Sequence, residues 1–82
     1  MSSIASLEPS KPQVSADAAL RIARLDAEQK YRDLSPYRIA IVFEESHWRI
    51  DYELRNPNFQ GGGPHYLIDS TTGVILSKRY AQ

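Results

Sequence analysis

Cysteine is absent from the 82 residues of this chain. Its absence excludes disulfide bonds, thiolate metal sites and cysteine nucleophiles, so packing alone must hold the fold together. A surplus of charge is also missing, because ten Lys and Arg residues balance ten Asp and Glu residues. Without a basic surplus there is no electrostatic basis for binding nucleic acid or an anionic membrane, and neither partner is expected.

Long apolar runs are missing too. Apolar residues make up 41% of the chain, but no run approaches the ~18 residues that a transmembrane helix requires. The N-terminal residues lack the basic start and the apolar stretch of a secretory signal, which predicts a cytoplasmic protein. The length leaves room for a single small domain.

Residues 1–14 are rich in Ser and Pro, which predicts a flexible leader before one domain over residues 15–82. A helix is expected to begin at Ser15, whose hydroxyl can cap free N–H groups. Apolar residues then recur at steps of three and four residues, and Pro36 is expected to end the helix by about Asp33 or Leu34. Because alanines dominate its apolar face, this helix can lie close to a sheet.

The hydrophobic period changes from 3.6 to 2 at Tyr37, which indicates β-structure for the rest of the chain. Strands are predicted over residues 37–44, 47–55, 64–70 and 74–80. In the last strand, Val74, Leu76 and Tyr80 are expected on one side. The loop before the third strand contains three consecutive glycines, of which Gly62 is expected to need a positive φ.

One helix followed by an antiparallel meander predicts an α+β domain of two layers, in the order α-β-β-β-β, with the helix packed on the four-stranded sheet. The predicted sheet carries more apolar side chains than one Ala-rich helix can hide. A homodimer through the sheet edges or the uncovered sheet face is therefore expected. A different partner protein on the same surface is the alternative, and the free protein would then be monomeric.

Patterns of catalytic or metal-binding residues are missing. His47 and Asp51 lie two pleats apart on one predicted strand, about 13 Å, which is too far for two ligands of one ion. Cross-strand pairing could bring His65 close to one of them. No serine-hydrolase or zinc-protease motif is present, and the glycine run lacks the Lys of a phosphate-binding loop. We therefore expect no catalytic residue, no metal and no cofactor.

Charged side chains of both signs gather on the outward face of the predicted sheet. They are candidates for a protein-binding surface, because a charge pattern selects partners more than it adds affinity. The alternative is a set of ordinary cross-strand ion pairs, which stabilise a solvated face by about 0.2–1 kcal/mol each. The candidate binding residues are Arg49, Asp51, Glu53, Arg55, His65 and Arg79.

The second half of the chain has a strand centred on a Trp, a Gly-Gly-Pro loop, an aliphatic strand ending in Asp, and a Thr-Gly turn before the final strand. This order resembles the small bacterial immunity proteins with a nuclear-transport-factor-like fold. The matching positions are Trp48, Gly62, Gly63, Pro64, Ile68, Gly73 and Ile75. The resemblance implies a non-enzymatic protein that neutralises a cognate toxin of the same bacterium.

Two alternatives accompany this prediction. The stretch Ile68–Leu76 also resembles the final hairpin of PepSY domains, which are associated with peptidase inhibition and envelope proteins. That resemblance implies an exported peptidase regulator. The other alternative is a small ligand-binding or enzymatic module that uses His47, Asp51 and His65.

Overall fold

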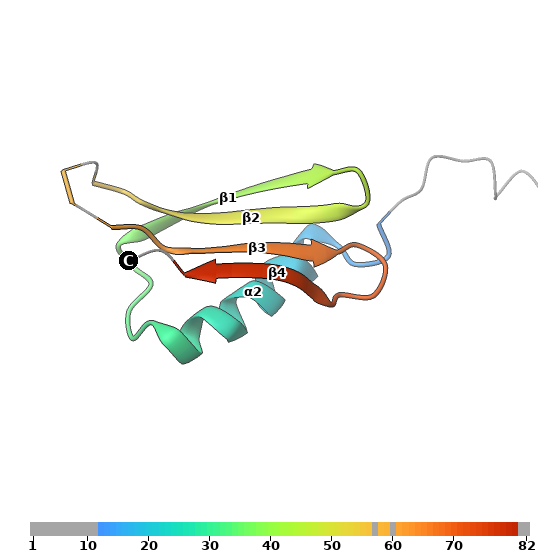
Figure 1. Ribbon diagram of the computed structural model, residues 1–82, viewed down its shortest axis with the longest axis horizontal. Helices are drawn as coiled ribbons and strands as arrows, with labels where there is room; N and C mark the ends of the chain where they lie inside the picture. Colours follow the sequence, from blue (N-terminus) through green and yellow to red (C-terminus); the bar gives the residue numbers. More distant parts are fainter. Residues whose placement is uncertain (1–11, 57, 60, 81–82) are drawn as a thin grey trace, which may run out of the picture.

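The computed structural model describes residues 12–56, 58–59 and 61–80. One helix, α2 (Ala16–Lys30), precedes four strands, β1 (Tyr37–Glu44), β2 (His47–Leu54), β3 (Pro64–Asp69) and β4 (Ile75–Tyr80). The strands form one antiparallel sheet in the order β1-β2-β3-β4, and α2 lies against one face of it (Figure 1). The predicted two-layer α+β fold is confirmed. No helix in the described part of the chain is long and apolar enough to cross a membrane.

The helix begins where the sequence predicts and ends earlier. The Ser15 hydroxyl accepts a hydrogen bond from the Ala18 N–H at 3.1 Å, which caps the first turn. The helix ends at Lys30, short of the Asp33 or Leu34 that the sequence allowed, because Tyr31 already has an extended backbone. The Tyr31 ring packs edge-on against Tyr37 at 5.9 Å, so tertiary contact ends the helix before Pro36 can act.

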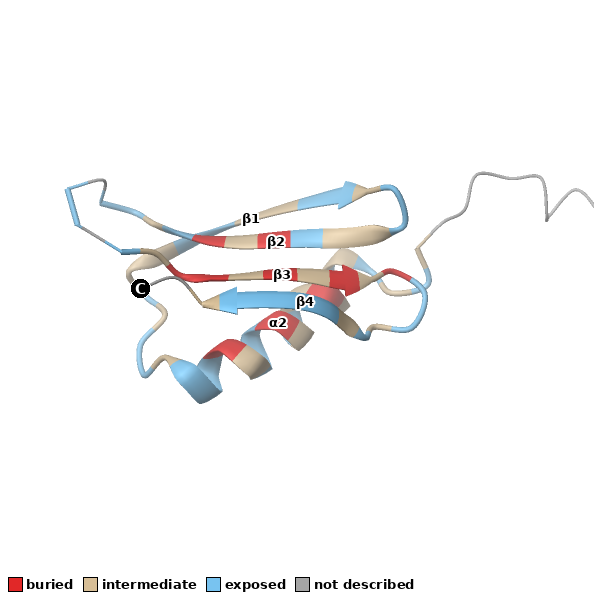
Figure 2. Cartoon of the chain, in the orientation of Figure 1, coloured by how far each residue is buried: buried red, intermediate tan, exposed pale blue. Residues whose placement is uncertain are grey.

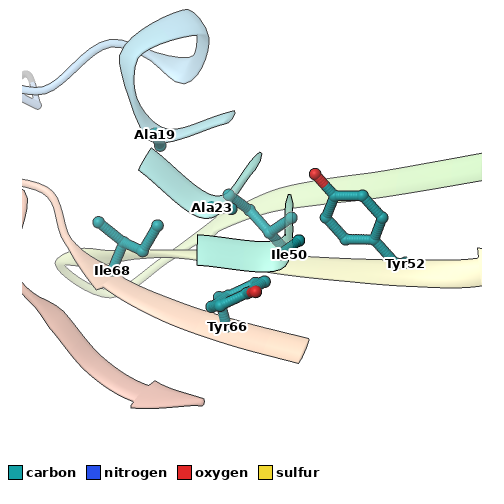
Figure 3. Close-up of a cluster of buried hydrophobic side chains, with 7 residues drawn as sticks. Ala19, Ala23, Ile50, Tyr52, Tyr66 and Ile68 are labelled. Carbon is teal, nitrogen blue, oxygen red and sulfur yellow. The ribbon is translucent and has the colours of Figure 1, made fainter. Parts of the chain in front are cut away.

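The core lies between the alanine face of α2 and the two central strands (Figures 2 and 3). Small side chains let the helix approach closely, so the larger side chains of the sheet can fill the interface. The buried hydrophobic residues of this cluster are Ala19, Ala23, Ala27, Ile50, Tyr52, Tyr66 and Ile68. Because α2 contacts β2 and β3, it leaves part of the edge strand β1 uncovered, with Ile39 47% and Phe43 39% exposed.

A β-bulge corrects the prediction for the last strand. The register between β3 and β4 shifts at Leu67 and Ile68, so that Ile68 pairs with Ile75. The extra residue, Leu76, reverses which side chains face the core at the start of β4, whereas Tyr80 stays on the helix side, where its hydroxyl reaches Asp26. As a result Ile75 packs against the core, whereas Val74 and Leu76 are each 55% exposed.

The side chain of Asp26 joins α2 to the last two strands. Its carboxylate accepts hydrogen bonds from the hydroxyls of Tyr66 at 2.9 Å and Tyr80 at 2.5 Å, and from the ammonium group of Lys78 at 3.0 Å. Burial by itself would raise the pKa of Asp26, but these three hydrogen bonds outweigh it and lower the pKa below its ordinary value. The ionised carboxylate is therefore part of the folded structure.

Two buried tyrosines differ in their hydroxyl groups, although each residue is only 2% exposed. The Tyr66 hydroxyl donates to Asp26, whereas the Tyr52 hydroxyl has no hydrogen-bond partner among the described residues. We expect Tyr66→Phe to lower the free energy of unfolding by about 1.5–3 kcal/mol, because it deletes a hydrogen bond to a charged group. Tyr52→Phe should leave it unchanged or raise it by up to about 1 kcal/mol. Urea unfolding of both variants checks this contrast, and equal losses would contradict it.

The glycine loop corrects a further prediction. Positive φ values belong to Gly61, at 96°, and Gly73, at 81°, and not to Gly62. The crowded position is Gly63, where a Cβ atom would lie 2.7 Å from the Tyr52 Cβ. Steric contact with β2, and not backbone strain at the middle glycine, is what requires a glycine in this run.

Residues 1–11 of the predicted leader lie outside the described residues. Val14 is held in place by two hydrogen bonds. Its N–H donates to the Ser70 carbonyl at 2.8 Å, and its own carbonyl accepts from the Trp48 indole at 2.8 Å. These bonds fix the entry to α2 against the ends of β2 and β3.

Candidate binding surface

The open face, defined as the face of the sheet opposite α2, carries most of the predicted binding residues. Strand alternation places Arg49, Asp51 and Glu53 of β2 on this face, because the intervening Ile50 and Tyr52 point into the core. No helix or strand among the described residues packs over it. The open face therefore presents the charged side chains of β2 without cover from another described element.

The strand register aligns residues from separate strands in one row. Asp51 pairs with His65 across β2 and β3, and His65 pairs with Arg79 across β3 and β4. Directly paired residues in an antiparallel sheet have neighbouring side chains on the same face. Three of the predicted residues are thus brought together although they are far apart in the sequence.

Asp51 is the centre of this row. One carboxylate oxygen, Oδ1, lies 2.6 Å from Nδ1 of His65, and Oδ2 accepts from Nε of Arg49 at 3.2 Å. Burial by itself would raise the pKa of Asp51, but the hydrogen bonds from His65 and Arg49 outweigh it and lower the pKa. Since an ionised carboxylate only accepts, Nδ1 of His65 carries the hydrogen of the shared bond.

Most of the surrounding charges are paired within the sheet. Arg49 also contacts Glu44 at 3.3 Å, and Glu53 contacts Arg38 at 3.3 Å. Arg79 is the exception, because it is exposed and has no ion-pair or hydrogen-bond partner in the described part of the chain. The open face therefore holds fixed charge pairs beside one unpaired cation.

These residues surround a shallow hollow of about 450 Å³. Five of the six predicted binding residues line it, together with three that the sequence analysis missed. Its lining residues are Arg49, Asp51, Glu53, His65, Tyr66, Leu67, Ser77 and Arg79. The sequence could have indicated Leu67 and Ser77. Each lies two residues from a predicted binding residue, His65 or Arg79, and side chains two residues apart on a strand point to the same face of the sheet.

Arg55 is the predicted residue that does not join the hollow. It follows the last residue of β2, and its Nε donates to the Ser35 carbonyl at 3.3 Å. Its own N–H donates to the Pro36 carbonyl at 2.9 Å. The observed contacts of Arg55 therefore fasten the loop before β1, away from the other five residues.

The residues of the hollow give little support for catalysis or metal binding. His65 and Asp51 form an oriented pair, but no hydrogen bond joins His65 to the nearby Ser77 hydroxyl among the described residues. No three His, Asp or Glu side chains converge on a metal-sized site anywhere in the described ranges. His47 pairs with Asp69 in the register, separate from the row of Asp51.

Comparisons of the chain with protein-family models, with curated proteins and with solved structures found no match.

Proposed function

We propose that this chain is a non-enzymatic protein-binding module that recognises its partner through the open face. The observation that carries the proposal is the unpaired Arg79 in the lining of a hollow whose other charged side chains are held in ion pairs. An exposed cation without a partner on a rigid surface is free to pair with a carboxylate of another protein.

The ion pairs support this proposal because they fix the charge pattern before binding. Asp51 holds both His65 and Arg49, so these side chains lose little rotamer freedom when a partner arrives. A pattern of fixed charges rejects wrongly charged partners and so provides specificity. Leu67 adds apolar contact area to the lining of the hollow.

The more specific proposal follows from the sequence resemblance. In this form the partner is a toxin made by the same bacterium, and the chain is the cytoplasmic immunity protein that neutralises it. An acidic group of the toxin would pair with Arg79, while the mixed charges around Asp51 set the orientation of the complex. An equimolar complex with the product of a neighbouring gene is the expected observation.

Reversing the charge of Arg79 tests the use of the open face. We expect Arg79→Glu to weaken the complex by roughly tenfold or more, because it replaces an attraction by a repulsion. Arg21→Glu makes the same charge change at an exposed position of α2 and serves as the matched control. Isothermal titration calorimetry measures both. An unchanged affinity for Arg79→Glu, or an equal loss for the control, would contradict the proposal.

The contact of 2.6 Å between His65 and Asp51 favours a second candidate, a ligand-binding or enzymatic module. Joint substitution of His47, Asp51 and His65 decides between the two. Loss of a ligand-induced shift in melting temperature would support the second candidate, and retained partner affinity would separate it from the first. The third candidate, a PepSY-like peptidase regulator, predicts an exported protein, which cell fractionation detects.

A further inference from the structure

No strand in the described part of the chain pairs with the outer edge of β1. Natural edge strands are usually shortened, bulged, or carry lysine or proline, because a bare edge can pair with another strand. β1 is eight residues long, pairs with β2 without a bulge, and has neither lysine nor proline in its sequence YRIAIVFE; its charged residues are Arg38 and Glu44. The opposite edge, β4, has both a bulge and Lys78. The β4 edge thus carries two features that discourage pairing with another strand, and the β1 edge carries neither of them.

The side chains of β1 are also unusually exposed for their type. Ile39 is 47% exposed and Phe43 is 39% exposed on the helix side, and Val42 is 46% exposed on the open face. The helix contacts β2 and β3, so it does not obstruct the approach of another sheet to this edge (Figure 1). Apolar side chains on both faces of an edge strand gain neighbours when another strand pairs beside it.

The direction of the backbone groups limits how a strand can pair there. Along an antiparallel strand, every second residue bonds through its backbone to the neighbouring strand. The Arg55 N–H donates to the carbonyl of Pro36, the residue just before β1. The even-numbered residues of β1 therefore bond to β2. The odd-numbered residues therefore direct their N–H and C=O groups outward. Tyr37 already donates to the Leu34 carbonyl at 3.1 Å, which leaves Ile39, Ile41 and Phe43 for an added strand.

We propose that a second copy of this chain pairs with β1 edge to edge, antiparallel, with the two-fold axis at Ile41. This register places Ile41 opposite Ile41 and Ile39 opposite Phe43 of the second copy. It also places Arg38 opposite Glu44 of the second copy, an attractive pair that the symmetry repeats.

A two-fold axis at Ile39 would instead set Arg38 opposite Ala40, and one at Phe43 would set Val42 opposite Glu44. The axis at Ile41 is thus the register that matches apolar with apolar and charge with opposite charge.

The proposed pairing extends a charge network that exists within each chain. Arg38 already contacts Glu53, and Glu44 already contacts Arg49. Across the two-fold axis these pairs join into a line of alternating charge on the open face. The dimer has one sheet of double width, with both helices on the same face and the hollow around Asp51 still accessible in each copy. The interface therefore leaves the hollow uncovered, while Arg38 and Glu44 contact two of its lining residues, Glu53 and Arg49.

Analytical ultracentrifugation of two charge variants tests this register. The wild-type chain is expected to sediment at micromolar concentration as a dimer, twice the 9.3 kDa of one chain. Arg38→Glu sets carboxylate against carboxylate across the axis, and Glu44→Arg sets guanidinium against guanidinium. Each variant alone should dimerise roughly tenfold to hundredfold more weakly, since two attractive pairs become repulsive.

An equimolar mixture of the two variants should regain dimerisation. In the mixed pair both carboxylates of one variant meet both guanidinium groups of the other, while the contacts within each chain are the same as in the separate samples. A single 9.3-kDa species for the wild-type chain would overturn the proposal. So would dimers that persist in both variants, or a mixture that stays monomeric. A wild-type monomer that pairs only with a strand of another protein would assign the edge to that protein.

Engineered cysteines give a second readout that keeps the native charges. The chain has no cysteine of its own, so every disulfide reports an introduced residue. Ile41→Cys places two thiols in a hydrogen-bonded pair, about 5.5 Å between Cα atoms, which a disulfide can span. Ile39→Cys is the matched control, because the two copies of position 39 would lie more than about 10 Å apart. Cross-linking by the first variant alone supports the register; equal cross-linking by both, or by neither, overturns it.

Discussion

Asp26→Ala is expected to lower the free energy of unfolding by about 2–4 kcal/mol, because the substitution removes an acceptor that binds three donors. The Tyr66 hydroxyl is buried and has Asp26 as its partner, so it would remain in the core without a hydrogen bond. Tyr80 and Lys78 would lose the contact that joins β4 to α2. This loss is large beside the roughly 4–12 kcal/mol typical of a domain of this size.

Chemical denaturation monitored by far-UV circular dichroism measures the loss. Glu28→Ala is the matched control, because Glu28 lies on the same helix and makes an exposed ion pair with Arg24 at 2.9 Å. An exposed pair of this spacing contributes about 0.3–0.5 kcal/mol. If Asp26→Ala and Glu28→Ala cost the same, the Asp26 cluster does not stabilise the contact between helix and sheet.

The same carboxylate predicts how stability depends on pH. The pKa of Asp26 is lowered from its ordinary value of 3.8 in the folded state, so folding favours the ionised form. The resulting stabilisation is complete above that ordinary value and is lost as the pH falls through the lowered pKa. Between about pH 5 and pH 2 the wild-type protein should therefore lose stability more steeply than Asp26→Asn. Some acid sensitivity should remain in the variant, because the pKa of Asp51 is also lowered.

Gly63→Ala is expected to lower the free energy of unfolding by about 1–3 kcal/mol, because a methyl group has no space at this position. The added Cβ would lie 2.7 Å from Cβ and 2.8 Å from the carbonyl oxygen of Tyr52, and 3.0 Å from Cδ1 of Tyr37. The Tyr52 contacts involve the backbone and first side-chain atom of a central strand, which cannot move without disturbing the core. The start of β3 at Pro64 would have to shift away from β2.

Gly62→Ala is the control for this prediction. Gly62 has no positive φ, and its carbonyl, which accepts from the Tyr37 hydroxyl at 3.4 Å, is kept in alanine. Its effect should stay within about 0.5 kcal/mol. Thermal melting of both variants provides the comparison. A Gly63→Ala protein that melts like Gly62→Ala would show that the sheet accommodates the extra methyl group.

The local pattern of the sequence determined the order of the elements. Alternation of apolar and polar residues from Tyr37 to Leu54 was sufficient to place β1 and β2, because a strand with one buried face must repeat every two residues. The three- and four-residue spacing of the alanines was sufficient to predict α2 and its buried face, although not its end at Lys30. Alternation on β2 also put Arg49, Asp51 and Glu53 on one surface.

Only the tertiary structure decided which distant residues meet. The row of Asp51, His65 and Arg79 depends on the register between three strands, and turn geometry and core packing select that register. The bulge opposite Leu67 and Ile68 reversed the faces at the start of β4, which alternation alone could not indicate. Asp26 shows the same limit, since its partners lie in strands that follow it by dozens of residues. In the sequence, Asp26 is only a charged residue on the apolar face of the helix. Its role in joining helix and sheet depends on the hydroxyl and ammonium groups that the folded sheet places around it.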